Sequence, residues 1–391
     1  MTAFTPERLL CAFGTAYVHQ QPLATHAPAE LHPSEETAFL ELVEREGLAP
    51  VVLAVGRKFP DAIAPLSPFV RARLQEQKHT QQLDSLMLSG ALVRVLRSLE
   101  REGIAAIPFK GPTFAHTYYG DISLRSYGDV DVIVPRERML HAKQVLLQMG
   151  YEPEHDLTEA DEQRFLDQRL AYAFHHPETV ICMELHWSVL PVHNGSTLPS
   201  ELIWERHTWA TFQEESVRAI DPALYAVYLC AHAAKHRWAK LKWLIDLVLL
   251  LRALQVDERR EVGALADALG FARVVGVGAC LLRDVLAVPL PSPLAALAHD
   301  AGAQTLASEV QDRWLFDDLG EGPFAASTWF HLRERERLRH RWPFALHSLR
   351  LLVQPSEKDR SAVPLPDRLA FLYPLVRAKR LLSVAARRLL S

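Results

Sequence analysis

The chain has 391 residues, which is too long for one simple hydrophobic core, so two or three domains are expected. Hydrophobic residues make up 49% of the sequence and charged residues 23%, a balance typical of a soluble globular protein. The formal net charge is −4, and no apolar run is long enough to span a bilayer, which excludes a membrane-spanning helical protein.

The cysteines and the N-terminal residues both bear on the cellular compartment. The four cysteines are scattered and form no Cys-x-x-Cys pair, as is typical of buried thiols in a reducing environment. The first residues lack the basic and then apolar pattern of a signal peptide. We therefore expect a cytoplasmic protein.

Residues 1–95 are expected to form a helical region. Apolar residues recur at helical spacing in three stretches, one beginning near Thr37, one near Phe69, and one running from Leu83 to Glu102. Prolines between residues 60 and 68 are expected to separate helices rather than to mark a long linker.

Residues 96–200 are expected to form a small α/β unit with a mixed sheet, because short apolar runs alternate with helical periodicity. Strands are predicted over residues 104–109, 130–134, 171–174 and 179–187, and helices over residues 113–119 and 137–149. The expected fold class is therefore α+β, with helical regions on both sides of a small sheet.

Residues 201–354 return to helical periodicity, and we expect this region to close a cleft against the sheet. Residues 355–391 are expected to form a proline-punctuated loop and a basic amphipathic helix from Leu369 onward. Residues 331–391 hold 14 Lys and Arg against 5 Asp and Glu, which permits an anionic partner such as RNA, a lipid surface or a polyphosphate. Packing of the apolar stripe of this helix on the helical body is the interpretation we favour.

Two aspartates lie at the start of the strand predicted over residues 130–134. Asp129 and Asp131 are two residues apart, so on a strand both carboxylates point to the same face. Two carboxylates held this close repel each other unless a cation lies between them, and a divalent metal ion is the simplest solution. We therefore predict both aspartates to be metal ligands.

Further residues complete the predicted site. Glu184 lies on an apolar strand, where an unpaired carboxylate would be costly, and is the candidate for the third metal ligand. His186 shares its face, and either lines the site or is a half-buried histidine with satisfied hydrogen bonds. Lys110 and Gly111 begin a short helix, where Lys supplies a charge for phosphate oxygens and Gly lets the backbone approach them.

Arg125 has two interpretations that stay open. Its guanidinium either contacts a phosphate or forms a structural pair with Asp129 or Asp121. Asp121 follows a glycine and is expected to be a turn residue.

The helical region carries a second group of polar residues. His232 and His236 have the i, i+4 spacing of a zinc pair, but the glutamate of the metalloprotease motif is absent, so a core or substrate-facing position is favoured. Lys235 is the lysine predicted to reach a nucleotide. Trp238 and Trp243 are expected to be packing residues.

These motifs occur in the same order as in a known family. Lys110-Gly111, Arg125, Asp129-Val130-Asp131 and the stretch from Glu184 to Trp187 resemble uncharacterised bacterial nucleotidyltransferases of the polymerase-β-like superfamily. A more distant similarity is to nucleotidyltransferase toxins of the abortive-infection type. The resemblance covers about residues 85–255, although Lys-Gly-Pro here replaces the Gly-Ser of compact superfamily members.

The resemblance implies a transferase that moves a nucleoside monophosphate from an NTP, such as ATP, to a hydroxyl or phosphate acceptor and releases pyrophosphate. It implies dependence on Mg²⁺, with two ions expected and Mn²⁺ as the alternative ion. The implied catalytic and metal-binding residues are Asp129, Asp131 and Glu184, and the implied nucleotide-binding residues are Lys110, Gly111, Arg125 and Lys235.

The acceptor is left open as a small molecule, a peptide or RNA. A toxin would use the 3′ end of tRNA, whereas a tailoring enzyme would modify a small molecule, sugar or peptide. A catalytically inactive nucleotide sensor or scaffold is a further alternative, and the complete set of three carboxylates argues against it.

Overall fold

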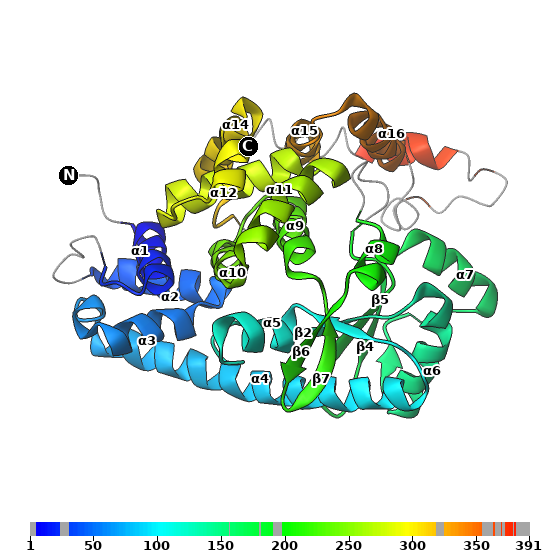
Figure 1. Cartoon of the computed structure of the whole chain (residues 1–391), viewed down its shortest axis with the longest axis horizontal. Coiled ribbons are helices and arrows are strands. Elements are labelled where there is room, and N and C mark those ends of the chain that lie inside the picture. The colour runs from blue at the N-terminus through cyan, green and yellow to red at the C-terminus, as the bar shows by residue number, and fades with distance from the viewer. Residues whose placement is uncertain are drawn as a thin grey trace.

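The computed structural model describes residues 5–23, 31–155, 157–179, 181–190, 198–317 and 324–353, with a few further positions between residues 363 and 380. A five-stranded mixed sheet lies between an N-terminal group of helices and a larger C-terminal group, which confirms the expected α+β class (Figure 1).

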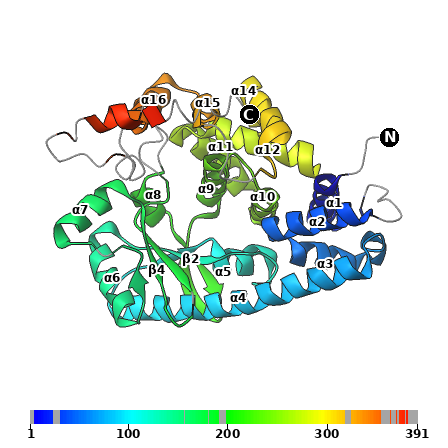
Figure 2. The same ribbon diagram turned by 180° about the vertical axis from the view of Figure 1, so that it is seen from behind.

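The long helix α4 connects the N-terminal helices to the sheet. The segments before the sheet are α1 (Pro6–His19), α2 (Pro33–Glu46), α3 (Ala49–Lys58), η1 (Pro60–Ala62) and α4 (Pro68–Arg101). Helix α4 begins at a cap in which the Ser67 hydroxyl accepts a hydrogen bond from the Val70 N–H at 3.3 Å. It lies beneath both the N-terminal helices and the sheet, along the lower edge of Figures 1 and 2.

Helix α4 differs from the sequence prediction, which placed two helices in this part of the chain. It is continuous over 34 residues because the polar stretch 75–82, between its apolar parts, contains neither proline nor glycine. The helix also passes through residue 95, where the predicted division of the chain placed a boundary. The division into four regions remains a prediction.

The sheet consists of β1 (Ile107–Phe109), β2 (Asp129–Ile133), β3 (Glu152–Pro153), β4 (Ala171–His175) and β5 (Cys182–His186). Its strand order is β1-β2-β5-β4-β3. Only the central β2–β5 pair is parallel among the strand pairs of this sheet, and the other pairs are antiparallel. The connection from β2 to β5 includes η3 (Arg136–Arg138), α6 (Met139–Gln148) and α7 (Glu159–Gln168).

The two faces of the central strands have opposite character. Val130, Val132, Met183 and Leu185 point to one face and are packed in a buried cluster with apolar residues of α4 and α6. Because side chains alternate along a strand, burial of this face fixes the other set, with its carboxylates, on the opposite face. The packing of helices α4 and α6 thus determines which face of β2 and β5 carries the carboxylates.

The chain beyond the sheet is mostly helical, as the sequence predicted. The segments are α8 (Ser200–Glu205), α9 (Pro222–Lys235), α10 (Leu241–Ala253), α11 (Val256–Leu269), α12 (Ala272–Leu286), α13 (Ser292–Ala298), α14 (Ala301–Glu309), η5 (Val310–Trp314), α15 (Phe324–Glu334) and α16 (Leu338–Val353). Two short segments between β1 and β2 face this group, the helix α5 (Gly111–Phe114) and the π-helical turn η2 (Ala115–Tyr119).

A β-hairpin interrupts this region and corrects the prediction of helices alone. Its strands are β6 (Thr208–Phe212) and β7 (Glu215–Ala219), which pair antiparallel. The two-residue turn is Gln213–Glu214, with φ of 47° and 68°. Such turns usually contain Asn or Gly, which tolerate positive φ, so the usual sequence signal of this hairpin is missing.

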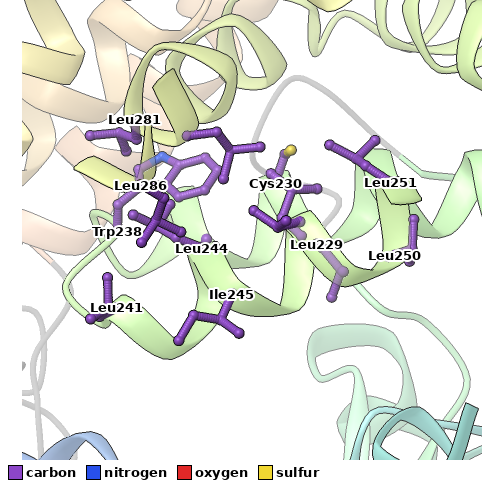
Figure 3. Close-up of a cluster of buried hydrophobic side chains, with 14 of the residues drawn as sticks. Leu229, Cys230, Trp238, Leu241, Leu244, Ile245, Leu250, Leu251, Leu281 and Leu286 are labelled. Carbon is purple, nitrogen blue, oxygen red and sulfur yellow. The ribbon is translucent and has the colours of Figure 1, made fainter. Parts of the chain in front are cut away.

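The C-terminal helices share one hydrophobic core with helices α1–α3. Figure 3 shows its part between α9, α10 and α12, where Leu244, Leu281 and Leu286 gather around Trp238. Trp238 is 1% exposed, which confirms its expected packing role. Helix α9, which crosses this core, is therefore held rigidly in front of the sheet.

The loop before β2 is held to α10 by a buried ion pair. Arg125 donates from Nε and Nη2 to the two carboxylate oxygens of Asp246, both at 2.9 Å. Tyr119 donates its hydroxyl hydrogen to Asp246 Oδ1 at 2.7 Å. Both charged side chains are buried, and the carboxylate raises the pKa of Arg125 although burial alone would lower it.

Beside this pair, Lys242 donates to the Ser126 carbonyl at 3.2 Å and to its hydroxyl at 3.4 Å. Burial and the nearby Arg125 charge lower the pKa of Lys242 from 10.5 to about 8. The loop that leads into β2 is therefore fixed to α10 at two successive residues.

The basic C-terminal helix predicted from Leu369 onward falls mostly outside the described residues, which include only short helical pieces at 373–377 and 379–380. Among the residues that are described, no helix combines the length and the apolar character that a bilayer crossing requires.

Replacing Asp246 by Ala leaves the Arg125 charge buried without its partner, so we expect the free energy of unfolding to fall by about 3–5 kcal/mol. The control Tyr119→Phe removes one hydrogen bond to the same carboxylate and should cost only about 1 kcal/mol. Urea unfolding of both variants measures the difference. Equal effects of the two changes would contradict the central role of the ion pair.

Lys242 predicts a pH dependence of stability. Its folded-state pKa of about 8 is below the unperturbed value of 10.5, so the unfolded state binds a proton more readily. The free-energy cost of burying the charged Lys242 side chain destabilises the folded state fully below pH 8, and this cost disappears as the pH rises toward 10.5. The wild type should therefore gain stability relative to Lys242→Met across this range, and a constant difference in urea midpoints from pH 8 to 10.5 would refute the prediction.

Candidate active site

Three polar side chains converge on the face of β2 and β5 that lies opposite the apolar cluster. The parallel register places Asp131 directly beside Glu184, and His186 follows two residues later on the same face. His186 Nε2 lies 2.8 Å from Asp131 Oδ1 and 3.0 Å from Glu184 Oε2. Since one ring nitrogen carries a single hydrogen, the imidazole bridges the two carboxylates through a shared donor. These bonds raise the pKa of His186, against the opposing effect of burial.

Asp131 is the most buried acid of this group, with 2% of its surface exposed. Its Oδ1 accepts from His186 and lies 3.4 Å from Lys110 Nζ, whereas its Oδ2 is buried and has no hydrogen-bond partner among the described residues. A buried oxygen without a partner loses its hydration and gains nothing in return. A cation at this position would satisfy it.

The arrangement fits a divalent metal ion. One ligand atom each of Asp131, Glu184 and His186 lies within 4.8 Å of the others. Carboxylate oxygens suit Mg²⁺ and Mn²⁺, and an imidazole is an acceptable ligand for transition metals. The donor set and the orphaned Oδ2 therefore agree in kind with the predicted metal site.

Asp129 lies at the start of β2, on the same face but in register with Cys182 rather than with Glu184. Burial and the neighbouring Asp131 raise the pKa of Asp129, and Lys110 partly offsets them. The structure thus brings two of the three predicted ligands together with His186 and places Asp129 beside them. The alternation of the β5 sequence was the signal that put His186 on this face.

Lys110 and Gly111 have unusual backbone conformations at the junction of β1 and α5. Lys110 has φ 54° and ψ −145°, a region where residues with a side chain are strained by about 1–3 kcal/mol. The Tyr225 hydroxyl accepts from the Lys110 N–H at 2.5 Å and holds this conformation. A Cβ at Gly111, which has φ 37°, would lie 3.3 Å from the Asp129 carbonyl oxygen. Glycine therefore allows the close approach of β2 to this turn.

The Lys110 side chain is directed at the acidic group, by which we mean Asp131 and Glu184. Its ammonium lies 4.9 Å from the centre of the Phe109 ring and 5.9 Å from that of Tyr228. Burial lowers its pKa, but Tyr228 and Asp131 outweigh burial and raise it. Lys110 is therefore a permanent positive charge beside Asp131.

The structure decides between the interpretations of Arg125 and shows the contacts of Asp121. The partner of Arg125 is Asp246, from a helix more than a hundred residues later, rather than Asp129 or Asp121. Asp121 accepts from the Ser123 N–H and hydroxyl, both at 2.8 Å, which confirms its role as a turn residue.

Helix α9 contacts β1, where the Tyr228 ring lies 5.8 Å from that of Phe109. His232, His236 and Trp243 pack ring against ring, with centroids 5.1 Å apart for the two histidines and 5.4 Å apart for His236 and Trp243. Burial and the charges of Lys235 and Lys110 lower the pKa of His236 to about 4 and hold the pKa of His232 well below its usual value. Both imidazoles are thus neutral near pH 7, in keeping with the substrate-facing or core position favoured from the sequence.

Lys235 lies near the acidic group as well. Burial and Lys110 lower the pKa of Lys235, whereas Glu184 raises it, so its ammonium lies within the electrostatic influence of the site. The site therefore combines carboxylates on the sheet with lysines on the β1–α5 turn and on α9.

Comparison with known proteins agrees with this arrangement. The model of a family described as uncharacterised nucleotidyltransferases matches residues 32–287, a range that includes every candidate site residue. A search of the curated proteins and a search of the solved structures give no match. Because the family model covers well over half of the sequence, the chain belongs to this family of uncharacterised nucleotidyltransferases.

Proposed function

We propose that the protein is a Mg²⁺-dependent enzyme that transfers a nucleoside monophosphate from an NTP to an acceptor hydroxyl or phosphate. The observation that carries this proposal is the buried Oδ2 of Asp131, which has no partner among the described residues and lies beside Glu184 and His186. A nucleotide-binding scaffold would have no use for buried carboxylates that lack a cation. Asp131 and Glu184 would hold the metal, with Asp129 and His186 beside them.

When bound, Mg²⁺ or Mn²⁺ would neutralise charge on the phosphate oxygens and the leaving pyrophosphate. Lys110 and Lys235 provide further positive charge from the two sides of the site, which suits a triphosphate. Gly111 keeps the β1–α5 turn free of a side chain that would separate this turn from Asp129. We assign Arg125 a positioning role, because its fork holds Asp246 and thereby the loop that leads into Asp129.

In the proposed reaction, the acceptor oxygen forms a bond to the α-phosphorus of the NTP. The bond from that phosphorus to the bridging oxygen breaks, and pyrophosphate leaves with the electron pair. For a hydroxyl acceptor, the proton passes to the Glu184 carboxylate, which is partly exposed and returns it to solvent.

The compartment we propose is the cytoplasm, since the four cysteines, Cys11, Cys182, Cys230 and Cys280, are all free thiols. The basic C-terminal segment, on which a tRNA-modifying toxin would depend for RNA contacts, lies mostly outside the described residues.

Replacing Asp131 by Asn removes the buried charge but keeps the shape of the side chain. Nucleotidyl transfer should fall by more than about 100-fold, because loss of a residue that only orients a metal ligand already costs up to about 100-fold. The assay follows label from each α-³²P-labelled NTP, in the presence of Mg²⁺, into components of a cell extract. EDTA should abolish the transfer, and Mg²⁺ or Mn²⁺ should restore it.

The matched control is Asp121→Asn, the same change in the loop before β2, where Asn preserves the turn. It should leave transfer within about twofold of the wild type. Retention of most activity by the Asp131 variant, with the control equally active, would show that the acidic group is not the catalytic centre.

A further inference from the structure

A cavity of about 160 Å³ shares Lys235 with the candidate site. It lies between α9, α12, α15 and α16, and most of its wall is apolar, with Phe271 and Phe344 among the lining residues. This volume is similar to that of a buried cavity that holds one benzene molecule, about 150 Å³. The cavity therefore fits a ring-sized group and excludes a folded partner or a nucleic-acid strand.

One part of the wall carries buried charge. Glu334 is 4% exposed, and its Oε2 lies 2.8 Å from Nδ1 of His331. Its Oε1 is buried and has no hydrogen-bond partner in the described part of the chain. An oxygen in this state is an acceptor for a ligand that donates a hydrogen bond.

Arg335 reinforces the charged part of the wall. Its guanidinium lies 3.9 Å from the centre of the Phe344 ring and donates to the His331 carbonyl. Arg335 is 7% exposed, so its charge and that of Glu334 are held away from bulk water. A ligand that donates a hydrogen bond to Glu334 would offset the cost of burying this carboxylate better than a wholly apolar ligand would.

Lys235 joins the cavity to the acidic group. It lines the cavity, and it lies close enough to Glu184 for that carboxylate to raise its pKa. Leu190, also in the wall, follows β5 by only a few residues. A ligand in the cavity would therefore contact Lys235 and the segment that follows β5.

We propose that this cavity is the acceptor subsite, and that the acceptor is a small molecule with a compact apolar ring or similar group that donates a hydrogen bond to Glu334 Oε1. The inference rests on the proposed function, because it assigns the acceptor of that reaction. The hydroxyl that attacks the nucleotide then projects past Lys235. A folded RNA or protein does not fit in a cavity of this size, and macromolecular acceptors are an outcome of the test.

The first test compares two isomers of equal size, benzyl alcohol and anisole, of which only the alcohol donates a hydrogen bond. Isothermal titration of the wild type should show benzyl alcohol binding about tenfold more tightly, the effect of one hydrogen bond to a charged acceptor. In Glu334→Gln, the amide oxygen remains the acceptor for His331 and the amide nitrogen faces the cavity. The preference for the alcohol should then disappear or reverse.

The second test fills the cavity. Ala234→Leu adds bulk to the wall and should weaken both ligands at least tenfold, while MgATP binding stays unchanged. The matched control is Ala54→Leu, the same change at a different cavity on α3, which should leave both affinities as in the wild type. Circular dichroism checks that both variants are folded.

The outcomes are distinct. Failure of both isomers to bind, or an equal preference in the wild type and Glu334→Gln, overturns the inference. Competition by adenosine, or weaker MgATP binding in Ala234→Leu, would make the cavity the nucleobase pocket instead. Labelling of macromolecules alone would also overturn the acceptor subsite. If the wild type shows no nucleotidyl transfer that depends on Asp131 but still binds the two isomers, the proposed function is refuted and the cavity remains a ligand site.

Discussion

The parallel pairing of β2 with β5 places Asp131 and Glu184 side by side on a face that is largely closed to water. Like charges at this distance repel, and burial strengthens the repulsion because the local dielectric constant is low. His186 and Lys110 offset only part of it, since one oxygen of Asp131 keeps no partner among the described residues. The apolar packing of α4 and α6 behind the sheet holds this unfavourable arrangement in place.

The charges around this face are separated by function. Lys110 lies beside Asp131, and Lys235 lies within the electrostatic influence of Glu184. The Arg125 charge is instead paired with Asp246 at the base of the loop before β2. The histidines of α9 stay neutral, because burial and the adjacent lysines disfavour a further positive charge. Lysine therefore supplies the positive charge beside the carboxylates, whereas the bidentate arginine pair holds the loop before β2.

Four of the five strands of the sheet, together with its carboxylates, could be predicted from sequence because they depend on local alternation, whereas the two-residue strand β3 is too short to give such a pattern. Asp129, Asp131 and Glu184 each follow a two-residue period that is visible without any tertiary information. Contacts between distant segments could not be predicted in this way. The Arg125–Asp246 pair joins residues 121 positions apart, and Glu334 meets the α9 wall only after six further helices have packed. The β6–β7 hairpin was missed because its turn lacks Asn and Gly.

The connection between β2 and β5 also bears on how the chain folds. Asp131 and Glu184 meet only after η3, α6, β3, α7 and β4 have been accommodated between them, and closing so long a loop carries a large entropic cost. Local helices such as α4 require no such closure and form on a much faster timescale. Until β2 and β5 pair, the two carboxylates stay apart and hydrated, and the repulsion between them arises only when these two strands come together.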